Sequence, residues 1–274
     1  MKYKIIFSDY DGTTAIGKIV SQNVKNAIKN YRNAGGKFIF CTGRHECSIK
    51  DVLNTNGIEV DGLITMQGAY ARVDDTVIVD GGISPKTVVD IINDAKKIGI
   101  YPSVWQKDKL FYFNESNSKE YAGYFKNVIE EDKIVLATSV NRLLDSDCGY
   151  YGKLIFNKTP TEIFNYFIDY VNQKYGNEVV AYSSGPNFIE VVSKNYTKFE
   201  TTKKVSEYLG FNENEVITVG DSSNDLTLLK YGFGIAVGNA DAELKKIAKF
   251  ISPSVTDNAL EYIINKVLNN EDFI

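Results

Sequence analysis

Short apolar blocks alternate with amphipathic segments in the first part of the chain. Positions 4–8, 37–41 and 63–66 are apolar runs of strand length, and the first of them ends directly before Asp9. Between the first two runs, positions 21–33 carry apolar residues three and four apart, which is the spacing of a helix with one buried face. Strands and helices in this order predict a parallel sheet covered by helices.

The same alternation returns in the last part of the chain. The expected strands there are 215–219 and 234–237, and the expected helices are 201–209, 225–231, 242–248 and 258–268. We therefore predict an α/β fold whose core is a doubly wound, mostly parallel, Rossmann-like sheet.

The middle segment is richer in aromatic residues and has its own secondary-structure pattern. Its expected strands are 109–113 and 152–156, and its expected helices are 85–97 and 161–175. We predict that residues 1–82 and 188–274 form one domain and that residues 83–187 form a second α/β domain inserted into it. Gly81-Gly82 and positions 183–186 are the expected hinges.

Composition excludes several classes of function. The 274 residues carry a net charge of −4, so no general basic field attracts nucleic acid or an anionic membrane. The first apolar run is too short for a signal peptide, and no run reaches the roughly 18 residues of a membrane span. We expect a cytoplasmic protein without nucleic-acid or membrane partners, and nothing in the pattern indicates an oligomeric state.

Cysteine and histidine are too few for several kinds of site. Cys41, Cys47 and Cys148 show no metal-ligand spacing, and their odd number argues against a disulfide framework. A single histidine, His45, excludes a zinc site built from several imidazoles.

Two carboxylates follow the first strand. Asp9 and Asp11 are two residues apart, so both can reach one site beyond the carboxyl end of the sheet, and Gly12 permits a sharp turn. Crowded carboxylates repel each other unless a cation lies between them, and Mg²⁺ suits such oxygen ligands. The alternative is an aspartate-rich turn without chemistry.

A second acidic strand end occurs far along the chain, in the run Gly220–Asp225. Asp221 stands where a second metal-binding carboxylate is needed. Asp225 opens the expected helix, and its alternative role is that of a helix cap alone. Capping is a weaker explanation for Asp221, because the residues from Ser222 to Asn224 already supply capping groups.

A third strand end offers Thr42, Gly43 and Arg44. A hydroxyl, a glycine N–H and the start of a helix together favour a phosphate-binding seat, although an ordinary strand-to-helix turn is the alternative. Arg44 could contact the substrate or form a surface ion pair.

Together these motifs resemble those of the haloacid dehalogenase superfamily of phosphotransferases. The resemblance rests on Asp-x-Asp-Gly-Thr at 9–13, Thr42 with its Gly-Arg, a lysine, and Gly-Asp-x-x-Asn-Asp at 220–225, in the same order along nearly the whole chain. The insertion looks like the large α/β cap of the Cof-type sugar-phosphatase branch, which sets substrate specificity.

The resemblance assigns the lysine to Lys198. The sequence departs from the usual family pattern next to this lysine and at two positions elsewhere. Phe199 stands where the family usually has Gly, which bears on the backbone beside Lys198. Gln67 replaces a usual Asn and keeps an amide, and Thr14 replaces a common Leu.

The resemblance also implies a Mg²⁺-dependent phosphatase mechanism. Asp9 would be the nucleophile that becomes an aspartyl phosphate, and Asp11 would be the general acid and base. The metal would be held by Asp9, the Asp11 backbone carbonyl and Asp221. Phosphate oxygens would be bound by Lys198, Thr42, Asn224 and the N–H groups near Tyr10 and Gly43, with Asp225, Ser222 and Arg44 in support.

Other functions remain open at this point. A phosphomutase would return the phosphoryl group to sugar, and a phospho-ligand-binding protein would use the same pocket without catalysis. A receiver-type signalling domain shares the acidic cluster but needs no inserted domain. The expected substrate is a small phosphorylated metabolite, and sugar phosphates, nucleotide fragments and vitamin phosphates all fit.

Overall fold

The computed structural model describes residues 1–126, 128–144 and 149–273, so Cys148 lies outside the described residues. The chain forms two compact units. The core unit comprises Met1–Arg44, Ile49–Val79 and Thr197–Ile274, and the inserted unit comprises His45–Ser48 and Asp80–Tyr196.

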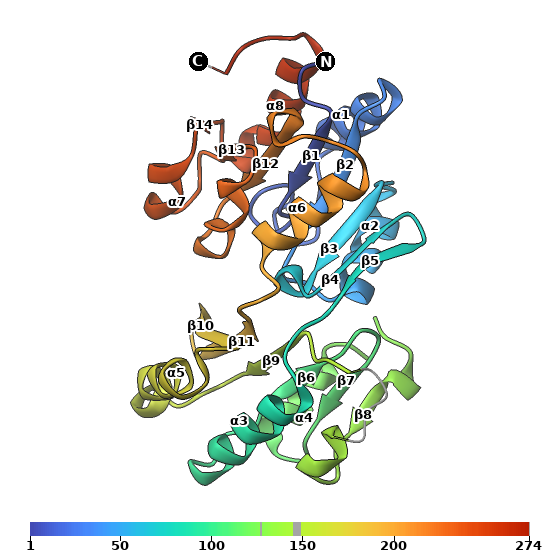
Figure 1. Ribbon diagram of the computed structural model, residues 1–274. Helices are drawn as coiled ribbons and strands as arrows, with labels where there is room; N and C mark the ends of the chain where they lie inside the picture. The colour runs from blue at the N-terminus through green and yellow to red at the C-terminus, as the bar shows by residue number, and fades with distance from the viewer. Residues whose placement is uncertain (127, 145–148, 274) are drawn as a thin grey trace. The chain divides into compact units, whose positions relative to one another are not determined.

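An eight-stranded sheet forms the centre of the core unit, in the order β14-β13-β12-β1-β2-β3-β4-β5 (Figure 1). Its strands are β1 (Ile5–Ser8), β2 (Lys37–Cys41), β3 (Gly62–Thr65), β4 (Tyr70–Val73), β5 (Thr76–Asp80), β12 (Val216–Gly220), β13 (Phe233–Ala236) and β14 (Phe250–Ile251). The strands from β14 to β3 pair in parallel, whereas β4 runs antiparallel to β3. The chain thus begins in the middle of the sheet and winds toward both edges.

The helices of this part of the chain have the amphipathic pattern that the sequence predicts. They are α1 (Gln22–Asn33), α2 (Glu46–Asn56), α6 (Lys198–Tyr208), α7 (Ala242–Ile247) and α8 (Ala259–Leu268). Ser21 caps α1 by accepting a hydrogen bond from the Val24 N–H, and the apolar face of α1 is buried. This helix packs against α8.

One expected helix does not form. The expected range 225–231 instead overlaps one short 3₁₀ turn, Ser223–Asp225, and contains a second, Leu228–Lys230. The Asp225 carboxylate accepts hydrogen bonds from the N–H groups of Asp221 and Ser222, so it closes a tight capping turn in place of the first turn of an α-helix.

A six-stranded sheet forms the inserted unit, in the order β10-β11-β9-β6-β7-β8. Its strands are β6 (Ser103–Trp105), β7 (Leu110–Tyr112), β8 (Ile134–Leu136), β9 (Lys153–Phe156), β10 (Val179–Gly185) and β11 (Phe188–Ser193), and its helices are α3 (Pro85–Lys97), α4 (Ser116–Gly123) and α5 (Thr161–Tyr175). Apolar residues of α3 and α5 join those of the sheet in one core.

The second boundary of the inserted unit differs from the expected one. Positions 183–186 are part of a hairpin, because Gly185 of β10 pairs with Phe188 of β11 and Asn187 takes a left-handed turn conformation with φ of 64°. The chain leaves the unit only after Tyr196. Gly81-Gly82, by contrast, lies next to the first boundary.

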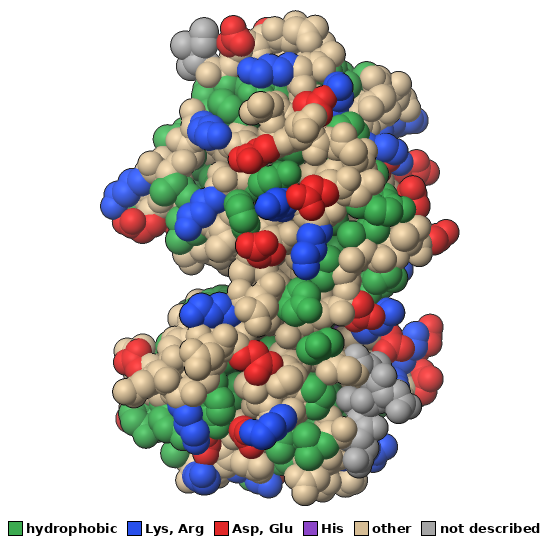
Figure 2. Space-filling view, in the orientation of Figure 1, with side chains coloured by type: hydrophobic (Ala, Val, Ile, Leu, Met, Phe, Trp, Pro, Cys, Tyr) green, Lys and Arg blue, Asp and Glu red, His purple; other side chains and the backbone are tan. Residues whose placement is uncertain are grey.

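Acidic and basic side chains are interspersed over the visible face in the space-filling view (Figure 2). Among the described residues, no helix combines the length and the apolar character needed to cross a membrane.

Candidate active site

Asp9 is held by the backbone at the end of β1. Its N–H donates to the Val219 carbonyl at 2.9 Å, and its carbonyl accepts from the hydroxyls of Ser8 and Thr14 at 2.9 and 2.8 Å. The residue is only 4% exposed. Gly12 turns the chain with φ of +79°, a conformation that glycine adopts without strain.

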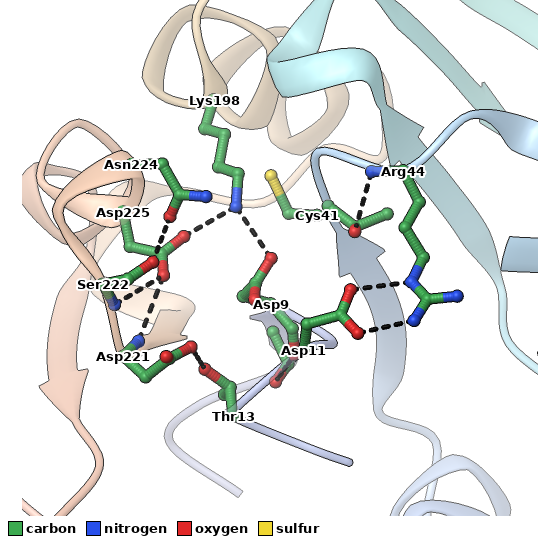
Figure 3. A network of polar contacts seen from close by, with 12 residues as sticks. Asp9, Asp11, Thr13, Cys41, Arg44, Lys198, Asp221, Ser222, Asn224 and Asp225 are labelled. Atoms are coloured by element: carbon green, nitrogen blue, oxygen red, sulfur yellow. Dashed lines mark hydrogen bonds and ion pairs between the residues drawn. The ribbon is translucent and has the colours of Figure 1, made fainter. Parts of the chain in front are cut away.

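A buried lysine contacts this aspartate. Lys198 is the first residue of α6, whose N-cap is Thr197, and its Nζ lies 2.8 Å from Asp9 Oδ1 and 2.6 Å from Asp225 Oδ1 (Figure 3). The lysine is 1% exposed. Phe199 therefore does not prevent Lys198 from reaching the cluster, and its ring instead packs on Tyr231.

Asp221 joins the cluster from the end of β12. One of its carboxylate oxygens accepts a hydrogen bond from the Thr13 hydroxyl at 2.7 Å. A side chain at position 12 would collide with the same carboxylate, so Gly12 allows the close approach of the two strand ends.

The three aspartates lie within reach of a single cation. One carboxylate oxygen each from Asp9, Asp221 and Asp225 lie within 4.8 Å of one another. Asp225 has partners on both oxygens, because Lys198 binds one and two backbone N–H groups bind the other. Asp9 and Asp221 are thus better placed to bind a further ligand.

Burial and mutual repulsion set the electrostatics of the cluster. Burial raises the pKa of Asp9, with Lys198 opposing the rise and Asp225 adding to it. Burial also raises the pKa of Asp221 to about 6, against the effect of the Thr13 hydrogen bond. Burial alone would lower the pKa of Lys198, but Asp225 and Asp9 raise it above its ordinary value, so the ammonium stays charged.

Asp11 lies beside the cluster but faces Arg44. The guanidinium of Arg44 binds the Asp11 carboxylate through two hydrogen bonds, of 2.7 and 2.6 Å (Figure 3). The Asp11 side chain is 48% exposed. The guanidinium carbon of Arg44 also lies 5.2 Å from the centre of the Tyr10 ring. Arg44 and Asp11 thus form an ion pair at the edge of the site.

The residues after β2 reach the same edge of the sheet. β2 pairs in parallel with β1, so Thr42 and Gly43 leave the sheet next to Asp9. Thr42 is 1% exposed, and its hydroxyl oxygen accepts from the Arg44 N–H at 3.1 Å. The Tyr10 side chain packs edge-on against Phe40 in the core, so the phenol is not available to a ligand.

The remaining expected residues form the loop after β12. The Ser222 hydroxyl donates to the Asn224 carboxamide oxygen at 2.6 Å, which directs that oxygen away from Lys198 and toward the loop (Figure 3). Ser222 is also the cap of the turn that Asp225 closes.

Two further residues support the site and were not among the expected ones. Thr13 fixes Asp221, and its place within the first motif is a signal that could have identified it. Asn239 donates to the Gly12 carbonyl at 2.8 Å from a position 227 residues away, for which the sequence carries no local signal.

Comparison with known proteins places this arrangement in a family. A sequence model of the haloacid dehalogenase-like hydrolases matches residues 6–264. The chain belongs to the haloacid dehalogenase-like hydrolase family.

Relatives match over nearly their whole lengths. The Bacillus subtilis protein named "Putative phosphatase YkrA" is 25% identical over 97% of this chain and 98% of its own. YwtE of the same organism, named as a 5-amino-6-(5-phospho-D-ribitylamino)uracil phosphatase, is 23% identical over 98% and 99%. The crystal structure of TM0651 from Thermotoga maritima has a TM-score of 0.80 at 22% identity, covering 96% of this chain and 97% of its own.

A second solved structure has the same fold. The sugar phosphatase BT4131, described as a member of subclass IIB of the superfamily, has a TM-score of 0.77 at 20% identity and covers 96% of this chain and 98% of its own. The two solved structures confirm the predicted α/β fold class. The family model and the named relatives confirm the predicted family and the enzyme class of phosphoric monoester hydrolase.

Proposed function

We propose that the protein is a Mg²⁺-dependent phosphatase that hydrolyses small phosphorylated metabolites, with sugar phosphates as the favoured class, through an aspartyl phosphate on Asp9. The observation that carries this proposal is the contact of one buried ammonium with two of three crowded carboxylates. Lys198 lies 2.8 Å from Asp9, and the oxygens of Asp9, Asp221 and Asp225 lie within 4.8 Å of one another.

The donor set fits magnesium. Asp9 and Asp221 offer carboxylate oxygens, and the backbone carbonyl of Asp11 is the third ligand in the proposal. These are hard oxygen donors, few enough to leave room for water and phosphate in an octahedral shell. When bound, Mg²⁺ would neutralise charge between the carboxylates and the phosphate.

The phosphoryl group needs further positive groups, because carboxylate and phosphate repel each other. In the proposal the Lys198 ammonium and the Thr42 hydroxyl bind its oxygens together with the N–H groups of Tyr10 and Gly43. Asn224 adds a hydrogen bond from its amide nitrogen, since its oxygen is engaged by Ser222.

The first half of the reaction transfers the phosphoryl group to the enzyme. An oxygen of Asp9 attacks phosphorus in line, a new O–P bond forms, and the bond to the leaving oxygen breaks. Asp11 gives a proton to that oxygen. Because Asp11 is paired with Arg44 in this structure, we infer that its side chain rotates toward the leaving group for this step.

The second half returns the enzyme to its starting state. Asp11 takes a proton from a water molecule, the water oxygen attacks phosphorus, and the Asp9–phosphorus bond breaks to release inorganic phosphate. Asp225 keeps Lys198 in place during both halves through its 2.6 Å contact.

The substrate class in the proposal draws on the relatives. BT4131 is described as a sugar phosphatase, and YwtE is named for a phosphorylated ribitylamino compound. Both names denote small phosphorylated metabolites, and the same class is proposed for this chain.

A panel of phosphorylated metabolites tests the proposal. Each compound is incubated with the protein and Mg²⁺, and released phosphate is measured with Asp9→Asn as the inactive variant. Asp75→Asn is the matched control, because Asp75 is an exposed aspartate in a turn of the core unit. Release of phosphate by the wild type and by Asp75→Asn only is the expected result.

Other outcomes distinguish the alternatives. Formation of a phosphorylated isomer without free phosphate would indicate a phosphomutase. Binding of phosphorylated compounds without any turnover would indicate a phospho-ligand-binding protein, and both results would contradict the proposal.

A further inference from the structure

A strained turn follows β3 in the core unit. Met66, Gln67 and Gly68 have successive φ values of 50°, 61° and 109°, all in the left-handed region. Two of these residues are not glycine, and such backbone strain persists only where surrounding contacts impose it. The turn is buried, with Met66 2% and Gln67 8% exposed.

One side of this turn is held by the loop that follows β2. The N–H of Met66 donates to the Arg44 carbonyl at 2.9 Å, and the N–H of Gln67 donates to the Thr42 carbonyl at 3.3 Å. The turn is therefore fixed by hydrogen bonds to the same loop that carries Thr42 and Gly43, the proposed phosphate-binding residues.

Its other side is held by the start of α6. The Thr201 hydroxyl donates to the Gly68 carbonyl at 2.7 Å. A Cβ at position 68 would lie 2.5 Å from the Thr197 carbonyl carbon and 2.9 Å from the Lys198 nitrogen. The strained turn thus lies between two elements that carry proposed phosphate ligands.

The Gln67 carboxamide lies on Gly43. A Cβ at position 43 would lie 2.5 Å from Gln67 Nε2, so the amide occupies space that any other residue at position 43 would fill. Among the described residues the carboxamide has no hydrogen-bond partner, although the residue as a whole is only 8% exposed. The polar atoms of the amide are not fully enclosed by protein, so a ligand that enters the site can reach them.

We propose that Gln67 is a further phosphate-binding residue, whose carboxamide N–H donates to a phosphoryl oxygen held by Thr42 and Gly43. The assignment rests on the proposed phosphatase function. Phosphoryl oxygens are charged acceptors, so they supply the partner that the amide lacks. The contacts on both sides of the turn keep the amide in place before the ligand arrives, which reduces the entropy lost on binding.

Gln67→Met tests the proposal, because methionine has nearly the same length and lacks the amide. Inorganic phosphate is the probe, and its dissociation constant in the presence of Mg²⁺ is measured by calorimetry for wild type and variant. We expect binding roughly tenfold weaker or more, as for a lost hydrogen bond to a charged group. The KM for p-nitrophenyl phosphate should rise by a similar factor, with the melting temperature unchanged.

Gln22→Met is the matched control, because Gln22 is exposed on α1 of the same unit and its amide donates a hydrogen bond to Asn26. If Gln67→Met does not fold, Gln67→Gly replaces it, since glycine adopts a φ of 61° without strain and also lacks the amide. Phosphate binding as tight as that of the wild type in a folded variant would overturn the proposal.

The calorimetric result is independent of turnover. If the wild type binds phosphate but hydrolyses no monoester, the phosphatase proposal fails while the Gln67 assignment is still decided by the change in phosphate affinity.

Discussion

Two acidic sites, one in each unit, have pKa shifts of opposite sign, although burial raises the pKa at both. In the inserted unit, Asp94 accepts from Lys97, Lys174 and the hydroxyls of Tyr170 and Tyr175. These donors hold the pKa of Asp94 well below its ordinary value despite the opposing effect of burial. In the core unit, burial raises the pKa of Asp9 in spite of Lys198.

The difference follows from the ratio of donors to carboxylates. One carboxylate at Asp94 faces two ammonium groups and two phenols, so its oxygens are satisfied by the protein itself. At the core site, three carboxylates are crowded together, and the ammonium of Lys198 contacts two of them, Asp9 and Asp225. A cluster with surplus donors contributes to stability, whereas a cluster with surplus carboxylates favours binding of a cation.

The largest expected effect is on turnover, which should depend on the core site and not on Asp94. Asp9→Asn should lower turnover by at least about a thousandfold, because the proposed nucleophile is lost. Asp94→Asn should leave turnover unchanged and lower the melting temperature. Phosphate release and thermal unfolding measure the two effects, and comparable loss of turnover in both variants would end the distinction.

Removal of Mg²⁺ should affect only the core site. Chelation should abolish turnover reversibly and lower the melting temperature, because a ligand at about 100 times its dissociation constant stabilises the folded state by ~2.7 kcal/mol. Thermal unfolding with and without chelator measures this shift. In Asp221→Asn the metal-dependent shift should shrink, whereas in Asp94→Asn it should persist; full activity in chelator would contradict the metal site.

Loss of the lysine should be costly only where the lysine is buried. Lys198→Met removes the ammonium from Asp9 and Asp225, and loss of one partner from a buried ion pair costs about 3–5 kcal/mol. Lys174→Met should have a much smaller effect, because its side chain is 47% exposed and Asp94 keeps other donors. Equal free energies of unfolding for the two variants, measured by urea denaturation, would refute the comparison.

The smallest expected effect is a difference in pH dependence. The pKa of Asp221 is about 6 in the folded protein against 3.8 ordinarily, so its favourable contribution to stability is present below pH 3.8 and is lost as the pH rises through 6. The loss should be less than about 3 kcal/mol, since solvent screens the partly buried group. Asp94 has the opposite sign, because its contribution is present above pH 3.8 and is lost as the pH falls through its lowered pKa.

Melting temperatures of the metal-free protein between pH 3 and 7 check this prediction. Asp221→Asn should reduce the decline between pH 4 and 6, to which Asp9 with its raised pKa also contributes, and Asp94→Asn should reduce the decline at lower pH. A wild-type curve that rises steadily from pH 4 to 6 in the absence of metal would be inconsistent with the Asp221 shift.

Much of the fold could be predicted because helices and strands have local periodic patterns. The expected helices at 85–97 and 161–175 have the bounds that the structure shows. The pattern at 225–231 predicts a helix that does not form, because the buried Asp225 carboxylate caps a tight turn and is held there by Lys198, a contact that depends on the tertiary fold. A hairpin forms where the sequence predicts a hinge at 183–186, because small residues and proline are typical of both structures.

The candidate site was predictable to the extent that strand ends could be located. The sequence placed Asp9, Asp11 and Asp221 directly after apolar runs, and parallel strands bring such positions to one edge. It left open whether Arg44 would face substrate or another side chain, and the structure pairs it with Asp11. Both geometries suit an arginine, so its sequence context could not decide between them.

By itself, then, the sequence determined the kinds of elements, their order and the chemical groups at the strand ends, because each depends on residues close together in the chain. The tertiary structure decided which distant groups meet: Thr13 with Asp221, Lys198 with Asp9, and the Gln67 amide with Gly43. The physical reason is that hydrogen bonds and ion pairs act over a few ångströms, and only the packing of the sheet and its helices sets those distances between remote residues.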